Sequence, residues 1–221
     1  MMMNLFSIFD PSTSSMLSFN WISILSILLM PMFYWVIPSR FQMTWKKIMI
    51  NIAQEMKTNL QKKNHKFLLI FITLFMTIMM SNTMGLIPYV FTASSHIMFS
   101  MLFAFPIWLS LMLYGWINHF TKMMIHLVPL GSPNALTVFM VLIETISNLI
   151  RPITLSVRLS ANMISGHLLI HLLTSIPYNM NSMYLIILPI MMTLLFLESA
   201  VAIIQSYVFI TLASLYTNEI Q

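Results

Sequence analysis

The 221-residue sequence contains no cysteine and only four glycines. Without cysteine, the chain has no disulfide bonds and no thiolate ligands for a metal ion. The glycines do not cluster into a phosphate-binding loop, and the sequence has neither an H-E-x-x-H nor a G-x-S-x-G element. We therefore expect no cofactor, no metal ion and no nucleotide or hydrolase site, and we expect that the chain is not an enzyme by itself.

Charge is also scarce. Charged residues make up 7% of the chain and hydrophobic residues 59%, and the mean hydropathy is +0.88. A soluble domain could not bury so much apolar surface, and hydrophobic runs separated by short polar breaks are typical of integral membrane proteins. We expect an all-α integral membrane protein, with about five to six helices in a single membrane domain over residues 1–221.

Three hydrophobic runs in the first half of the chain have membrane-spanning length. They predict spanning helices over residues 19–37, 67–87 and 97–117. Between the first two lies a loop, residues 38–66, that carries seven of the ten basic residues. Apolar residues recur in this loop at helical spacing: Phe41, Trp45, Ile48, Ile52 and Met56. This pattern leaves two interpretations open, an amphipathic segment lying on the membrane surface or a solvated loop.

The basic residues predict the orientation of the chain. Loop 38–66 is strongly basic, residues 88–96 contain no Lys or Arg, and residues 118–133 contain Lys122. By the positive-inside rule, loop 38–66 faces the inner side, the cytoplasm or matrix, and the N-terminus faces the other compartment. The net charge of +5 thus indicates orientation rather than nucleic-acid binding. The first residues resemble neither a signal peptide nor a transit peptide, so no cleaved presequence is expected.

Two much longer segments form the second half of the chain. Residues 134–176 and 183–216 predict helices on the order of 60 and 50 Å long, which exceeds the ~30 Å hydrocarbon core. They must tilt steeply or break, and Pro152 is the candidate break in the first helix. Turn residues between the segments predict a long, strongly tilted C-terminal helical hairpin whose tip lies on the outer side.

The first of these segments carries most of the charge found in the hydrophobic regions. Polar residues recur in it at intervals of seven: Glu144, Arg151, Arg158 and Ser165. An ionised group at bilayer depth costs roughly 2.5–3.5 kcal/mol on insertion scales, so a functional role is the default interpretation. The alternative is that Glu144 and the two arginines pair within a helical bundle. Arg158 has no acidic residue three or four positions away, so its charge must be balanced by another helix or subunit.

Groups that can exchange protons lie near Arg158 in the sequence. Arg158 stays protonated and cannot carry protons, but its fixed charge favours the ionised form of a passing carboxylate. His167 lies further along the same helix and Glu198 lies on the return helix. A second histidine, His171, is more typical of a hydrogen-bonded packing residue.

The predicted topology orders these groups across the membrane. The first helix of the hairpin starts on the inner side, so Glu144 lies toward the inner face, His167 toward the outer face, and Arg158 between them. Two offset access routes separated by a positive barrier are therefore predicted.

The run IETISNLIRPITLSVRLSANMISGHLLIHLL, residues 143–173, closely resembles the signature helix of the subunit a family of proton-transporting ATP synthases, in its mitochondrial form. LESAVAIIQSYVFITLASLY, residues 197–216, resembles the last helix of that family. The likeness continues in MGLIPYVFTASSH, LYGWINHF and HLVPLGSP, so it covers essentially the whole chain. The element Arg-Leu-x-x-Asn-x-x-x-Gly-His is highly specific, and the start and the methionine usage are similar to arthropod members.

The resemblance implies a stator subunit that builds two half-channels against a rotating c-ring of small proteolipid subunits and couples proton flow to ATP synthesis. It implies that Arg158 faces the carboxylate of the ring, with Asn162 and Gln205 close by. It assigns the remaining relay residues to two routes: His167 and Glu198 to the outer route, and Glu144 to the inner route. It gives Arg151 no role.

The same resemblance implies a place and partners. The expected location is the mitochondrial inner membrane, with the N-terminus toward the intermembrane space and the C-terminus toward the matrix. Expected partners are the c-ring, the peripheral stalk and other membrane-sector subunits, a second copy in a complex dimer, and membrane lipid, but no nucleic acid. A secondary ion transporter and a structural membrane subunit are the alternatives, although the sequence lacks the internal repeats usual in transporters.

Overall fold

The structure, a computed structural model, describes residues 5–14, 17–29, 37–60, 62–128, 136–179 and 184–219. Within these ranges the chain contains no β-strand, which confirms the predicted all-α fold. Six α-helices occur there: α1 (Arg40–Asn59), α2 (Leu68–Gly85), α3 (Ile97–Asn118), α4 (Phe120–His126), α5 (Thr137–Asn179) and α6 (Tyr184–Glu219). Four shorter 3-10 helices accompany them: η1 (Leu5–Phe9), η2 (Phe19–Leu29), η3 (Lys62–Phe67) and η4 (Ala93–Ser95).

Four helical stretches of the described chain are long and apolar enough to cross a membrane. They are His65–Gly85, Ile97–Asn118, Thr137–Ser175 and Ile187–Asn218. The chain is therefore a multi-pass membrane protein. The span predicted over residues 19–37 lies partly outside the described residues. Its described part forms the 3-10 helix η2, and a membrane crossing there stays a prediction.

Much of the basic segment 38–66 is helical. The start of α1 is fixed by a capping box. The backbone N–H of Gln42 donates a hydrogen bond to the Ser39 hydroxyl at 3.3 Å, and the backbone N–H of Ser39 donates one to the side-chain oxygen of Gln42 at 2.9 Å. One stripe of α1 faces the core, with Trp45 and Ile52 partly buried and Met56 fully buried. Phe41 and Ile48, which belong to the same predicted apolar stripe, are exposed, and a position of α1 on the membrane surface stays a prediction.

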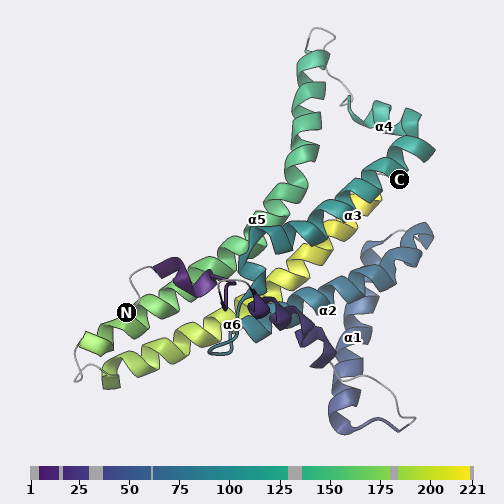
Figure 1. Cartoon of the computed structure of the whole chain (residues 1–221). Helices are drawn as coiled ribbons and strands as arrows, with labels where there is room; N and C mark the ends of the chain where they lie inside the picture. Colours follow the sequence, from purple (N-terminus) through teal and green to yellow (C-terminus); the bar gives the residue numbers. More distant parts are fainter. Residues whose placement is uncertain are drawn as a thin grey trace.

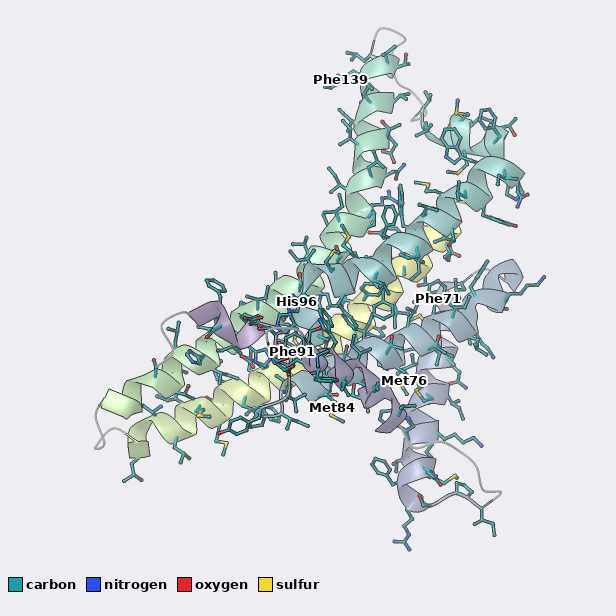
Figure 2. The ribbon with its side chains drawn as sticks, in the orientation of Figure 1. Phe71, Met76, Met84, Phe91, His96 and Phe139 are labelled. Atoms are coloured by element: carbon teal, nitrogen blue, oxygen red, sulfur yellow. The ribbon has the colours of Figure 1, made fainter. Side chains whose placement is uncertain are left out.

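The N-terminal segment docks onto the connection between α2 and α3. The His96 ring lies 2.9 Å from the backbone oxygen of Phe9, and the rings of Trp21, Phe91 and His96 stack with centroids 5.2 to 5.6 Å apart. Figure 2 shows Phe91 and His96 side by side at the centre of the molecule. This cluster anchors the start of the chain to the end of the α2–α3 hairpin.

The helices α5 and α6 form the long hairpin expected from the sequence, with 43 and 36 residues. Figure 1 shows that α5 changes direction near its middle, so that one part runs beside α6 and the other diverges from it. We call residues 137–150 the α5 arm; Phe139, near its tip, is labelled in Figure 2. Pro152 lies two residues after the arm, is buried, and has no backbone N–H to bond the carbonyl of Asn148.

The core lies where α1, α2, α3, α5 and α6 meet. Its buried apolar residues come from all five helices, and they include Phe71 and Phe75 of α2, Leu159 of α5 and Ile210 of α6. Small hydroxyl residues are buried along α5 and α6 as well: Ser156, Ser160, Ser206 and Ser214. Small side chains let helix backbones approach closely where lipid offers no hydrophobic driving force.

Candidate functional site between α5 and α6

A hydrogen bond joins the two long helices at a pair of amide side chains. The Asn162 side chain donates to the side-chain oxygen of Gln205 at 3.1 Å. Gln205 is buried and Asn162 is exposed, so the bond lies at the edge of the helix interface. The structure thus brings together two residues that the sequence analysis grouped.

Glu198 lies against the α5 backbone at Gly166. A Cβ atom at position 166 would lie 2.6 Å from a carboxylate oxygen of Glu198 and 2.8 Å from its carboxyl carbon. Any larger residue at position 166 would require the end of the Glu198 side chain to move. Glu198 is only 8% exposed, and neither of its carboxylate oxygens has a hydrogen-bond partner in the described part of the chain. A buried carboxyl group of this kind requires water or a proton.

A cavity of about 300 Å³ opens beside Glu198, and we call it the Glu198 cavity. Its polar lining comes from His167, Asn162 and Ser165 as well as Glu198, and its other walls are mainly leucines. The Nε2 atom of His167 has no hydrogen-bond partner among the described residues. The volume can hold on the order of twenty waters. His167 and Glu198, predicted to act together, therefore share one polar cavity.

A second cavity, of about 60 Å³, lies between the α5 arm, α3, α4 and α6. We call it the Glu144 cavity, because Glu144 lines it together with Asn148 and Arg151 of α5 and Tyr216 of α6. The rest of the lining is mostly apolar, and the indole nitrogen of Trp108 in this wall has no hydrogen-bond partner among the described residues. The space can hold on the order of five waters.

Arg158 lines neither cavity. It lies between Glu144 and His167 along α5, its side chain is exposed, and no hydrogen bond or ion pair to its guanidinium is recorded among the described residues. The interpretation that Arg158 pairs within the bundle therefore receives no support from the described chain. None of the described residues therefore balances its charge.

The sequence analysis missed several members of this arrangement. Arg151, for which it found no role, lies with its guanidinium carbon 5.0 Å from the centre of the Tyr216 ring. Asn148 and Trp108 were not singled out either, and both line the Glu144 cavity. The seven-residue spacing placed Arg151 on the polar stripe of α5. A single sequence does not show which residues of another helix such a side chain contacts. His171 lies on α5 outside both cavity linings.

The described residues contain no cluster of three or more His, Cys, Asp or Glu side chains that could hold a metal ion. Comparison with known proteins gives a consistent result over the full length. Residues 2–218 match the ATP synthase A chain family. The chain is 54% identical to proteins named ATP synthase subunit a from Anopheles quadrimaculatus and Anopheles gambiae, and 50% identical to the one from Drosophila melanogaster. Each of these matches covers all of both chains.

Proposed function

The chain belongs to the ATP synthase A chain family, and from that membership we propose which residues pass the protons and by which routes. A member of this family is the proton-translocating stator subunit of the membrane sector, a channel subunit of the enzyme complex. A secondary transporter or a purely structural subunit does not fit this membership.

We propose that Arg158 faces the carboxylate of the rotating c-ring. The observation that carries this assignment is an exposed arginine on a membrane-spanning helix with no partner in the described chain, between two cavities that hold titratable groups. A guanidinium keeps its proton, so it can hold a ring carboxylate in the ionised form without passing protons itself. Asn162 and Gln205, one helical turn away, hold α5 and α6 together at this level.

The outer route is proposed to run through the Glu198 cavity. His167 and Glu198 are side chains that can accept and release protons. The Nε2 atom of His167 and both carboxylate oxygens of Glu198 have no hydrogen-bond partner in the described chain. Water in a cavity of this size would satisfy them and link them to the outer compartment. A proton arriving here is passed to a ring carboxylate, whose neutral form can then rotate into lipid.

The inner route is proposed to run through the Glu144 cavity. A ring carboxylate that approaches Arg158 from the other side becomes ionised and releases its proton toward Glu144. Since Arg158 separates the two cavities, a proton cannot cross directly and must travel with the ring. Each proton carries only about 2.3 kcal/mol per 100 mV, so several must be combined through rotation to drive one synthesis.

The proposal includes a location and partners. We place the chain in the mitochondrial inner membrane, with the N-terminus toward the intermembrane space and the basic segment 38–66 toward the matrix, because the basic residues are concentrated there. The partners are the c-ring, the peripheral stalk and other membrane-sector subunits, membrane lipid, and a second copy of the chain in a dimer of complexes.

The test is Arg158→Ala in the assembled complex. ATP-driven acidification of membrane vesicles and the passive proton leak after removal of the catalytic head are both measured. We expect normal assembly with coupled pumping abolished. Arg40→Ala, an arginine outside both cavities, serves as the matched control and should pump normally. Pumping by Arg158→Ala near the unmodified rate would show that Arg158 is structural and would remove the two-route mechanism.

A further inference from the structure

Arg151 and Tyr216 meet across the same interface as Asn162 and Gln205. The two contacts lie eleven residues apart along α5 and eleven residues apart along α6, which is three helical turns or about 16 Å. One is a hydrogen bond between amides and the other is a cation over an aromatic ring. We propose that Arg151 and Tyr216 form a cation–π brace that fixes the α5 arm relative to α6 and so sets the position of Glu144. The proposal rests on the proposed inner route.

A cation–π contact is a favourable interaction for Arg151 and Tyr216 because both lie within membrane-spanning helices. Arg151 is half-buried in a membrane-spanning helix, where a charge needs compensation, and the ring contact is one of its interactions there. The face of an aromatic ring supplies negative electrostatic potential without adding a group that ionises near neutral pH. A carboxylate in the place of Tyr216 would also balance the charge, but it would add a second proton acceptor to a cavity that already holds Glu144.

The arm needs such a brace because α5 is weak at the base of the arm. Pro152, the next residue after Arg151, cannot donate to the Asn148 carbonyl, so the helix loses a backbone hydrogen bond where the arm joins the rest of α5. The arm diverges from α6 in Figure 1, and Val138 near its tip is 72% exposed, so packing at the tip does little to hold it. Arg151 therefore contacts α6 directly beside the position where α5 loses this hydrogen bond, and the contact ties the base of the arm to α6.

Glu144 is the group that such a swing would displace. It lies on the arm seven residues before Arg151, about 10 Å along the helix. The freed carbonyl of Asn148 lies between them, and both Glu144 and Asn148 line the cavity that Arg151 and Tyr216 close. Proton transfer to Glu144 depends on hydrogen-bond distances, so a loose arm would slow release on the inner side. Arg151 and Tyr216 are thus positioning residues that act through Glu144.

The brace can be tested by exchanging the ring while leaving the arginine. Tyr216→Phe keeps the aromatic face, and Tyr216→Leu removes it. Tyr207→Leu is the matched control, since Tyr207 is another tyrosine of α6 and lines neither cavity. Arg151→Met, which keeps a long side chain without charge, provides a second way to break the same contact if Tyr216→Leu reduces assembly.

Two readouts are measured in the assembled complex. The chain has no native cysteine, so spin labels placed at Leu142→Cys on the arm and Ile204→Cys on α6 report the arm position, with accessible cysteines of other subunits replaced. ATP-driven pumping reports function. We expect Tyr216→Phe and Tyr207→Leu to match the unmodified complex. Tyr216→Leu and Arg151→Met should broaden the distance distribution and lower pumping about tenfold.

Three outcomes would overturn the proposal. An unchanged distance distribution in Tyr216→Leu and Arg151→Met would show that the contact does not hold the arm. Equal defects in Tyr216→Phe and Tyr216→Leu would show that the hydroxyl matters and the ring face does not. Neither result touches the Arg158 assignment. A broadened distribution with normal pumping would instead remove the positioning role together with the inner route through Glu144, while the outer route would stand.

Discussion

The carboxylate of Glu198 lies so close to the backbone of Gly166 that a single methyl group at position 166 would overlap it. This contact joins the return helix to the signature helix at the level of the Glu198 cavity.

Gly166→Ala should displace Glu198 and slow proton entry from the outer side. The new Cβ atom would lie 2.6 Å from a carboxylate oxygen, so the side chain must move by several tenths of an ångström or more. We expect coupled pumping to fall about tenfold or more. Gly115→Ala on α3, a glycine outside both cavity linings, is the control for a glycine-to-alanine change elsewhere. Adding Glu198→Asp to Gly166→Ala should relieve the overlap and recover part of the rate. If Gly166→Ala pumps at the unmodified rate and adding Glu198→Asp changes nothing, the contact between Gly166 and Glu198 is unimportant for proton entry.

Glu198→Gln should abolish ATP-driven pumping while the complex still assembles. The amide has the shape of the carboxyl group but cannot accept and release a proton near neutral pH, so it tests chemistry rather than packing. Acidification of vesicles is the measurement, and Glu55→Gln on α1, outside both cavities, is the matched control. Normal pumping by Glu198→Gln would mean that protons bypass this residue.

Because a hydrogen bond joins Asn162 and Gln205, substitutions at the two positions should have non-additive effects on stability. Asn162→Leu leaves the Gln205 oxygen buried without a donor, which costs roughly 1–3 kcal/mol, while the double variant with Gln205→Leu removes both polar groups. Interhelical hydrogen bonds in membranes average a coupling energy of about 0.6 kcal/mol. We expect the double variant to be less destabilised than the sum of the singles, as measured from the thermal stability of the complex. Strict additivity would argue against the bond.

His96 should anchor the N-terminal segment through two separable contacts. His96→Phe loses the hydrogen bond to the Phe9 oxygen but keeps a ring beside Trp21 and Phe91, whereas His96→Ala loses both. A net hydrogen bond contributes about 1 kcal/mol and an aromatic pair about 0.5–1.5 kcal/mol. Hydrogen exchange over residues 5–9 should therefore accelerate about fivefold in His96→Phe and further in His96→Ala. Equal rates in the two variants would assign the anchoring to the hydrogen bond alone.

The sequence predicted the all-α membrane fold and the family because these depend on composition and on a short, specific run of residues. The confirmed features include the four long apolar stretches and the C-terminal hairpin. The helix in segment 38–66 was left open, although Ser39 and Gln42 have the spacing of a capping box. Both this spacing and the helical periodicity of the apolar residues are signals of the helix α1.

The relationships between helices could not be predicted in the same way. Intervals of seven place Glu144, Arg151 and Arg158 on one stripe of a straight helix, but they do not report the change of direction in α5. They also do not report the register between α5 and α6, which decides that Arg151 meets Tyr216 and that Glu198 meets Gly166. The register depends on small residues such as Ser156 and Ser206, which let the two helix backbones approach closely. Because many other serines in these helices could occupy the interface equally well, the sequence alone does not select one register.

The two cavities differ fivefold in volume, about 300 Å³ beside Glu198 and about 60 Å³ beside Glu144. If the two proposed routes are treated as electrical resistances in series with the ring, they are unequal. We expect the smaller, mostly apolar Glu144 cavity to conduct less well and to carry the larger share of the membrane potential. Under the proposed mechanism, proton release toward Glu144, rather than uptake, would then be the voltage-sensitive step.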